Sequence, residues 1–63
     1  MSVAISSQLL AFVARDQAGN GKRIDVFQAI IIAYDDGRMN MWYLGYDERG
    51  KINKYKREEL VIL

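Results

Sequence analysis

Apolar residues gather in segments that are separated by three polar breaks, each containing glycine. Residues 17–22 include a Gly-Asn-Gly sequence, residues 35–37 are Asp-Asp-Gly, and residues 47–50 are Asp-Glu-Arg-Gly. Sequences of this kind favour the tight turns of β-hairpins. The pattern therefore predicts four main segments, connected mostly as hairpins.

The most apolar segment lies between the first two breaks. Residues 26–33 are apolar at seven of eight positions and include three consecutive isoleucines. β-branched side chains favour a strand, and an unbroken apolar run is typical of a strand buried on both faces. We therefore expect a strand over residues 23–34 at the centre of the core, with Ile31 buried. Because ~12 residues exceed the usual ~5–6, this strand should bend or bulge.

The next segment, residues 38–46, predicts a second strand in which neither face is polar. Its alternation places Met39, Met41 and Tyr43 on one side, and Asn40, Trp42, Leu44 and Tyr46 on the other.

The C-terminal quarter predicts three short elements. Residues 51–56 carry three lysines, which is typical of an exposed edge strand. Residues 57–60 suit a turn or a single 3₁₀ turn. Residues 61–63 are apolar, so we expect a final strand that pairs with an earlier strand or with another subunit.

The first segment has two interpretations. Residues 8–15 can form a strand that returns through the Gly-Asn-Gly turn. Alternatively, Ser7 can cap a short helix that ends at Gly19, because Leu9 and Phe12 have helical spacing. The strand is favoured, since the isoleucine-rich segment needs a neighbour for its backbone hydrogen bonds.

From about residue 8 to residue 63, this order of elements resembles the small SH3-like β-barrel. The resemblance rests on the order of strands and turns, and the acidic, proline-binding signature of signalling SH3 domains is not visible. It implies an all-β domain, either a five-stranded SH3-like barrel or a strongly bent antiparallel sheet. Members of this architecture bind nucleic acids, peptides or methylated lysine, or assemble into oligomers, so the resemblance does not settle function.

The length of the chain allows one small domain, which we expect to be a single β domain over residues 1–63. It has 63 residues and a mass of 7.3 kDa, and 51% of its residues are hydrophobic. A domain of this size removes only about 60% of its unfolded surface from water, so association with a partner would add stability. Cysteine and histidine are absent, which excludes disulfides, thiol nucleophiles and histidine-based catalysis.

The net charge of +1 is far from the strongly basic balance of a protein that binds nucleic acid through its overall charge. The sequence shows no signal-peptide pattern and no apolar run of ~20 residues, so a cytoplasmic location and no membrane contact are expected. No nucleophile, base, metal site or cofactor site converges, so we expect no enzymatic activity, no metal and no cofactor.

Five of the nine basic residues fall between positions 49 and 57, with a tyrosine among them. One interpretation is a nucleic-acid-binding strand in which the cations contact phosphates and Tyr55 stacks on a base. The other is a solvated edge strand whose charges are balanced by the flanking acids Asp47, Glu48, Glu58 and Glu59. The candidate nucleic-acid-binding residues are Arg49, Lys51, Lys54, Tyr55, Lys56 and Arg57.

Three aromatic residues of the 38–46 segment form a second candidate site. Trp42 and Tyr46 share one face of the expected strand, so with Tyr43 they could contribute to a stacking platform. The alternative is that the tryptophan, the only one in the chain, anchors the core.

Two function classes follow. The first, which is slightly favoured, is a module that binds DNA or RNA through the basic strand. The second is a protein-interaction or self-assembling module, most simply a symmetric homodimer, because large apolar residues occupy both faces of the two longest predicted strands. Salt should weaken the first kind of binding and not the second.

Overall fold

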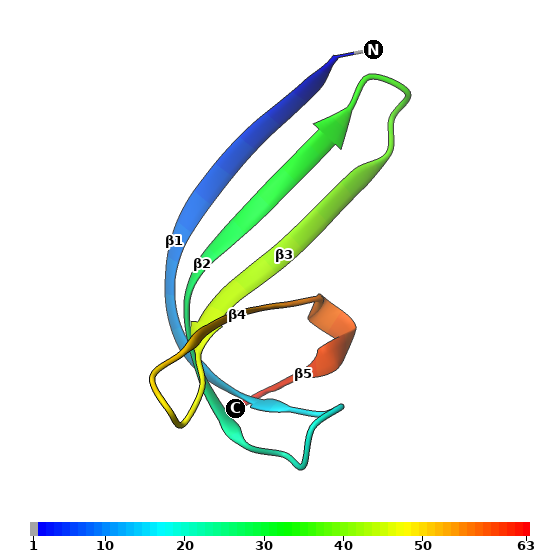
Figure 1. The fold of residues 1–63 in the computed structure, drawn as a ribbon. Helices are drawn as coiled ribbons and strands as arrows, with labels where there is room; N and C mark the ends of the chain where they lie inside the picture. Colours follow the sequence, from blue (N-terminus) through cyan, green and yellow to red (C-terminus); the bar gives the residue numbers. More distant parts are fainter. Residues whose placement is uncertain (1) are drawn as a thin grey trace.

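The computed structural model describes residues 2–63 and shows an all-β fold. Five antiparallel strands form one curled sheet in the order β4-β3-β2-β1-β5 (Figure 1). The elements are β1 (Val3–Asp16), β2 (Arg23–Tyr34), β3 (Met39–Tyr46), β4 (Ile52–Tyr55), the 3₁₀ turn η1 (Arg57–Glu59) and β5 (Leu60–Ile62). The prediction of an all-β domain is confirmed.

The three glycine-containing breaks form the turns, as predicted. Asn20 and Gly21, between β1 and β2, have φ angles of 71° and 68°. Asparagine and glycine are the residues that tolerate this left-handed conformation best, which explains why the chain reverses at this point. The turns between β2 and β3 and between β3 and β4 likewise contain glycines with positive φ.

The first segment is a strand, and the helical alternative is wrong. Strand β1 pairs with β2 from Val3 opposite Tyr34 to Arg15 opposite Arg23. It begins five residues earlier than the predicted start at residue 8. The antiparallel ladder satisfies the backbone of the isoleucine-rich strand, and this long-range pairing outweighs the local helical spacing.

Two bulges at the same level bend the sheet. The pairing register shifts in β1 between Leu9 and Phe12, and in β2 between Val26 and Gln28. Leu9 lies opposite Gln28, so the two irregularities are adjacent. Bulges increase local twist and bend a strand, and here they separate a curled half-barrel from a long extension of β1, β2 and β3 (Figure 1). The predicted bulge in β2 is confirmed.

The core lies in the half-barrel and is small. Its buried cluster consists of Ala14, Ile24, Val26, Tyr55 and Leu60, with Leu10, Phe12 and Tyr43 packed against it. The prediction that Ile31 is fully buried at the centre of the core is wrong, since Ile31 is only half-buried. The buried positions of β2 are Ile24, Val26 and Ala29, and the residues of the strand after Ala29 are only half-buried.

The C-terminal segment pairs with β1, as one of the two predicted arrangements requires. Ala14 lies opposite Ile62 and Asp16 opposite Leu60. The Leu63 amide donates to the Val13 carbonyl at 3.1 Å. This pairing places Leu60 in the core, whereas the side chains after it remain exposed.

Candidate functional site

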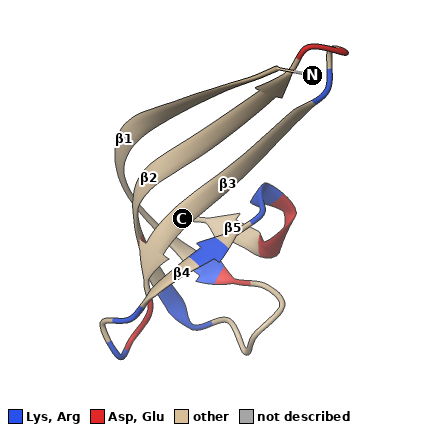
Figure 2. Ribbon diagram, turned by 45° about the horizontal axis from the view of Figure 1, so that its top comes forward, with Lys and Arg blue, Asp and Glu red and all other residues tan. Residues whose placement is uncertain are grey.

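The basic residues predicted as a nucleic-acid site lie along the chain from the β3–β4 turn through β4 to η1. Arg49, Lys51, Lys54, Lys56 and Arg57 are all exposed. Figure 2 shows basic and acidic segments close together on the half-barrel. The local potential is therefore mixed rather than uniformly positive.

Asp47 organises the turn that presents Arg49 and Lys51. Its Oδ1 accepts the backbone N–H groups of Arg49 at 2.9 Å and Lys51 at 3.0 Å, and its Oδ2 accepts the Asn53 side-chain amide at 2.9 Å. The hydrogen bond from the Lys51 backbone, followed by the other donors, lowers the pKa of Asp47 below its ordinary value of 3.8. The carboxylate is thus engaged in building the turn.

Lys54 and Lys56 converge on Trp42. Their Nζ atoms lie 4.9 Å and 5.0 Å from the centre of the indole ring. The pairing of Leu44 with Lys54 places β4 beside β3 so that both lysines reach the face that carries Trp42. Cation–π attraction accounts for this arrangement. Trp42 is half-buried, so it is neither a core anchor nor a free stacking surface.

Tyr55 is not available for stacking. Its side chain is buried in the core cluster, with 6% of its surface exposed. Burial is the main cause that raises the pKa of its hydroxyl above 10.0. Tyr55 lies opposite Tyr43 on the core side of the sheet, so its predicted role in stacking on a base is incompatible with its position.

The basic residues line two separate hollows instead of one surface. Arg49, Lys51 and Lys54 line a hollow of about 510 Å³ at the turn end of the half-barrel, together with the carboxylates of Asp16 and Asp47. The other two cations, Lys56 and Arg57, line a hollow of about 350 Å³ between η1 and the start of β3.

The three predicted platform aromatics do not form one platform. Tyr43 lies on the core side, where its ring meets Phe12 edge-on with 5.9 Å between centroids. Tyr46 packs against Phe27 at 4.9 Å, and Trp42 lies beneath the two lysines. Each ring already has a partner within the chain, which leaves no shared stacking surface.

A different surface stands out, on the part of the sheet beyond the bulges, which we call the ribbon and define as residues 3–9, 28–34 and 39–44. None of these residues is charged. In Figure 2 these segments are drawn entirely in tan up to the turn at the tip, because they contain no Lys, Arg, Asp or Glu. The exposed fractions of its apolar side chains reach 84% at Leu9, 68% at Ile5 and 63% at Met39.

The ribbon is apolar on both faces. The cross-strand rows place Ile5 opposite Ile32, and Ser7 opposite Ile30, which in turn lies opposite Trp42. On this face, the outer face, the apolar residues are Val3, Ile5, Leu9, Ile30, Ile32, Trp42 and Leu44. The inner face continues from the core through Ala29 and Tyr43, and its apolar residues beyond them are Ala4, Ile31, Ala33, Met39 and Met41.

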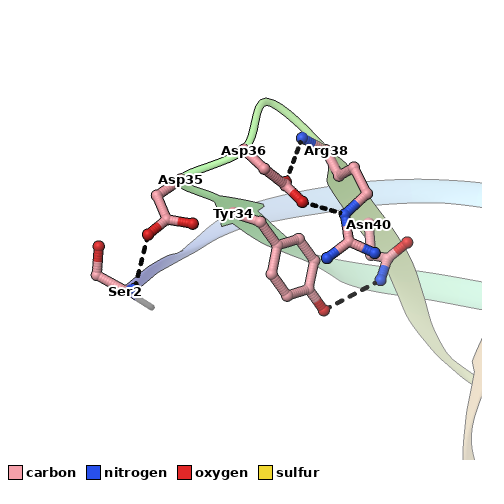
Figure 3. A network of polar contacts seen from close by, with 6 residues as sticks. All are labelled: Ser2, Tyr34, Asp35, Asp36, Arg38 and Asn40. Atoms are coloured by element: carbon pink, nitrogen blue, oxygen red, sulfur yellow. Dashed lines mark hydrogen bonds and ion pairs between the residues drawn. The ribbon is translucent and has the colours of Figure 1, made fainter.

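Polar contacts close the tip of the ribbon. The Ser2 amide donates to Asp35 Oδ2 at 3.0 Å, which ties the start of β1 to the β2–β3 turn (Figure 3). Arg38 forms an ion pair with Asp36 at 2.7 Å and lies over the Tyr34 ring at 5.0 Å. The charges at the tip are thus partly neutralised locally, and the three strands are held in register at their far end.

The alternation of the 38–46 segment indicated its two apolar faces, but it did not reveal the ribbon as a separate surface. Residues 3–7 were not assigned to a strand, although the absence of charge from residue 2 to residue 14 was a visible signal.

Within residues 2–63, no group of three or more acidic residues is placed to hold a metal ion. No helix in the same range is long and apolar enough to cross a membrane.

Comparisons with protein-family models, with curated proteins and with solved structures found no significant match. The chain's own geometry therefore carries the functional argument.

Proposed function

We propose that this protein is a non-enzymatic module that associates with a protein chain through its ribbon, and that it assembles with itself. The observation that carries the proposal is the ribbon itself. Its three adjacent segments of β1, β2 and β3 contain no charged side chain, and their apolar residues remain exposed on both faces. Exposed apolar patches of this kind mark interaction surfaces. The small core adds a second reason, because a domain of this size gains stability from covering such a surface.

A matched pair of variants tests whether the ribbon is the surface through which the protein associates with itself. Ile5 is 68% exposed on the ribbon, and Ile52 is 51% exposed on β4, outside it. Ile5→Lys should reduce self-association measured by sedimentation at about 100 μM protein, a concentration that detects micromolar affinity. Ile52→Lys, which adds the same charge elsewhere, should leave self-association unchanged.

Equal effects of the two variants would refute the ribbon as the associating surface. Circular dichroism serves as the folding control, because both side chains are already exposed and neither substitution removes core packing.

A second candidate function is nucleic-acid binding through exposed cations, with Lys54 and Lys56 at its centre. Its support is the convergence of these two ammonium groups on the indole of Trp42. Such a site would contact phosphates with the two lysines, which the indole of Trp42 holds close together. Tyr55 would take no part, because it is buried.

We also propose that the fold is of the SH3-like barrel type. Two features support this assignment: the sheet order places β5 and β4 at opposite edges of the β1–β2–β3 meander, and the 3₁₀ turn η1 connects β4 to β5.

A further inference from the structure

Within residues 2–63, the edge of β1 that faces away from β2 is unpaired along most of its length. Strand β5 pairs with β1 only at Ala14, Arg15 and Asp16. From residue 3 to residue 11, β2 is the only strand beside β1 in the described chain (Figure 1). In an antiparallel strand, alternate N–H and C=O groups point away from the existing partner. This edge can therefore accept another strand.

The same stretch lacks the features that usually protect an edge. Residues 3–11 contain no charge, no proline and no glycine, and the bulge of β1 lies only at their far end. Natural edge strands are normally blocked by lysines, prolines, bulges or short length. We therefore expect another strand to cover this long, uncharged and exposed edge in the functional protein.

The sequence of this edge is symmetric in polarity about Ser7. Residues 6–8 are Ser-Ser-Gln, and apolar residues flank them on both sides: Val3, Ala4 and Ile5 before, Leu9, Leu10 and Ala11 after. When β1 lies antiparallel to a second β1 with the two Ser7 residues opposite each other, Ile5 faces Leu9 and Ser6 faces Gln8. Apolar residues then meet apolar residues, and polar residues meet polar ones.

The neighbouring registers lack this match. Centring the pair on Ser6 places Ile5 opposite Ser7, and centring it on Gln8 places Ser7 opposite Leu9. A register centred between two residues would pair side chains of opposite faces, because side chains alternate along a strand. Among these registers, only the one centred on Ser7 places apolar residues opposite apolar residues and polar residues opposite polar ones. It also keeps the outer faces of both copies on the same side of the sheet.

We propose that the occupant of this edge is a second copy of the chain, joined antiparallel along residues 3–11 about a two-fold axis at Ser7. The result is a continuous ten-stranded sheet made of two five-stranded halves. The inference rests on the proposed self-association and adds its site and register. It follows the isologous rule, in which residue i of one copy meets residue j of the other and the reverse.

The size of this contact predicts a weak dimer. Residues 3–11 contribute nine residues from each copy, fewer than the ~20–30 residues per side of a standard interface. The dissociation constant should therefore lie in the micromolar range, and the dimer should be observable at about 100 μM protein.

Cysteine cross-linking tests the register, because the chain has no native cysteine. In the Ser7→Cys variant, the two Cα atoms of the central pair lie about 4.5–5.5 Å apart, within the range of a disulfide. Under a mild oxidant such as diamide, this variant should form a covalent dimer rapidly. Ser6→Cys is the matched control: its two copies are offset by two residues, about 8 Å apart, beyond disulfide reach.

The expected result is at least tenfold faster cross-linking of Ser7→Cys than of Ser6→Cys. Equal rates, or faster cross-linking of Ser6→Cys, would overturn the register. If Ile5→Lys nevertheless weakened self-association and Ile52→Lys did not, the ribbon would still be the associating surface and only its geometry would be wrong. A strictly monomeric parent at about 100 μM would exclude the second copy and leave a strand from another protein as the occupant.

Discussion

At the residue scale, Gly45 of β3 lies where the neighbouring strand β2 leaves no room for a side chain. A Cβ atom added there would lie 2.5 Å from Ile24 Cγ2 and 3.1 Å from the Asp25 carbonyl oxygen. Ile24 belongs to the core and its neighbours are packed, so it has little room to move. We expect Gly45→Ala to reduce the free energy of unfolding by about 1–3 kcal/mol, measured by urea denaturation.

A double-mutant cycle identifies the cause of that loss. Ile24→Ala is destabilising by itself, but it removes the methyl group that the new Cβ would strike. Gly45→Ala should therefore be less harmful in the Ile24→Ala background than in the parent. Identical losses in both backgrounds would mean that the clash with Ile24 is not the reason.

Asp47 makes the stability contributed by the β3–β4 hairpin depend on pH. Hydrogen bonds from the backbone of Lys51 and Arg49 and from the Asn53 side chain hold its pKa below 3.8 in the folded protein. A carboxyl whose pKa is lowered by folding contributes stability above its unfolded pKa, and this contribution disappears as pH falls through the folded pKa. The stability advantage of the parent over Asp47→Asn should thus be constant above pH 3.8 and shrink below it.

Denaturation of both proteins at a series of pH values checks this expectation. Glu48→Gln removes a negative charge from the same turn and controls for the general effect of net charge. A difference between the parent and Asp47→Asn that grew as the pH fell would contradict the assigned role of Asp47.

At the scale of elements, the turns were the most predictable part of the fold. Glycine-containing polar breaks indicated all three hairpin reversals because their backbone requirements are local. The first strand was ambiguous, since Leu9 and Phe12 fit both a helical and an extended pattern. Pairing with β2 decides between the two, and a pairing across the chain cannot be read from the spacing of one segment.

The candidate sites were also predictable only in part. The alternation of side chains along a strand is local, whereas the burial of one face depends on the rest of the sheet. Alternation along β4 places Lys54 and Tyr55 on opposite faces, but alternation does not say which face meets the core. Tyr55 therefore proved to be buried while the two lysines reached Trp42. The expectation for Ile31 failed because an apolar run indicates burial only where the chain supplies a covering layer.

At the scale of the whole molecule, charge and exposed apolar surface are largely segregated. The half-barrel and its turns carry the basic and acidic residues of β4, η1 and the hairpin ends, while the ribbon up to its tip carries none (Figure 2). The molecule measures 38 Å along its longest axis and 20 Å and 18 Å across. The extended ribbon thus presents apolar strands away from the charges, which is an arrangement suited to association by strand pairing and apolar contact.

This segregation predicts opposite responses to salt for the two proposed functions. Self-association through the uncharged ribbon should be insensitive to sodium chloride and should tighten in sodium sulfate, which favours apolar burial. Nucleic-acid binding through Lys54 and Lys56 should weaken as salt rises, because phosphate contacts release counterions, and Lys54→Ala should flatten that salt dependence by about one unit of slope. Sedimentation and a DNA or RNA titration over the same salt series separate the two functions. Self-association that fell steeply with sodium chloride would show that charged residues outside the ribbon form the interface, and would refute the ribbon proposal.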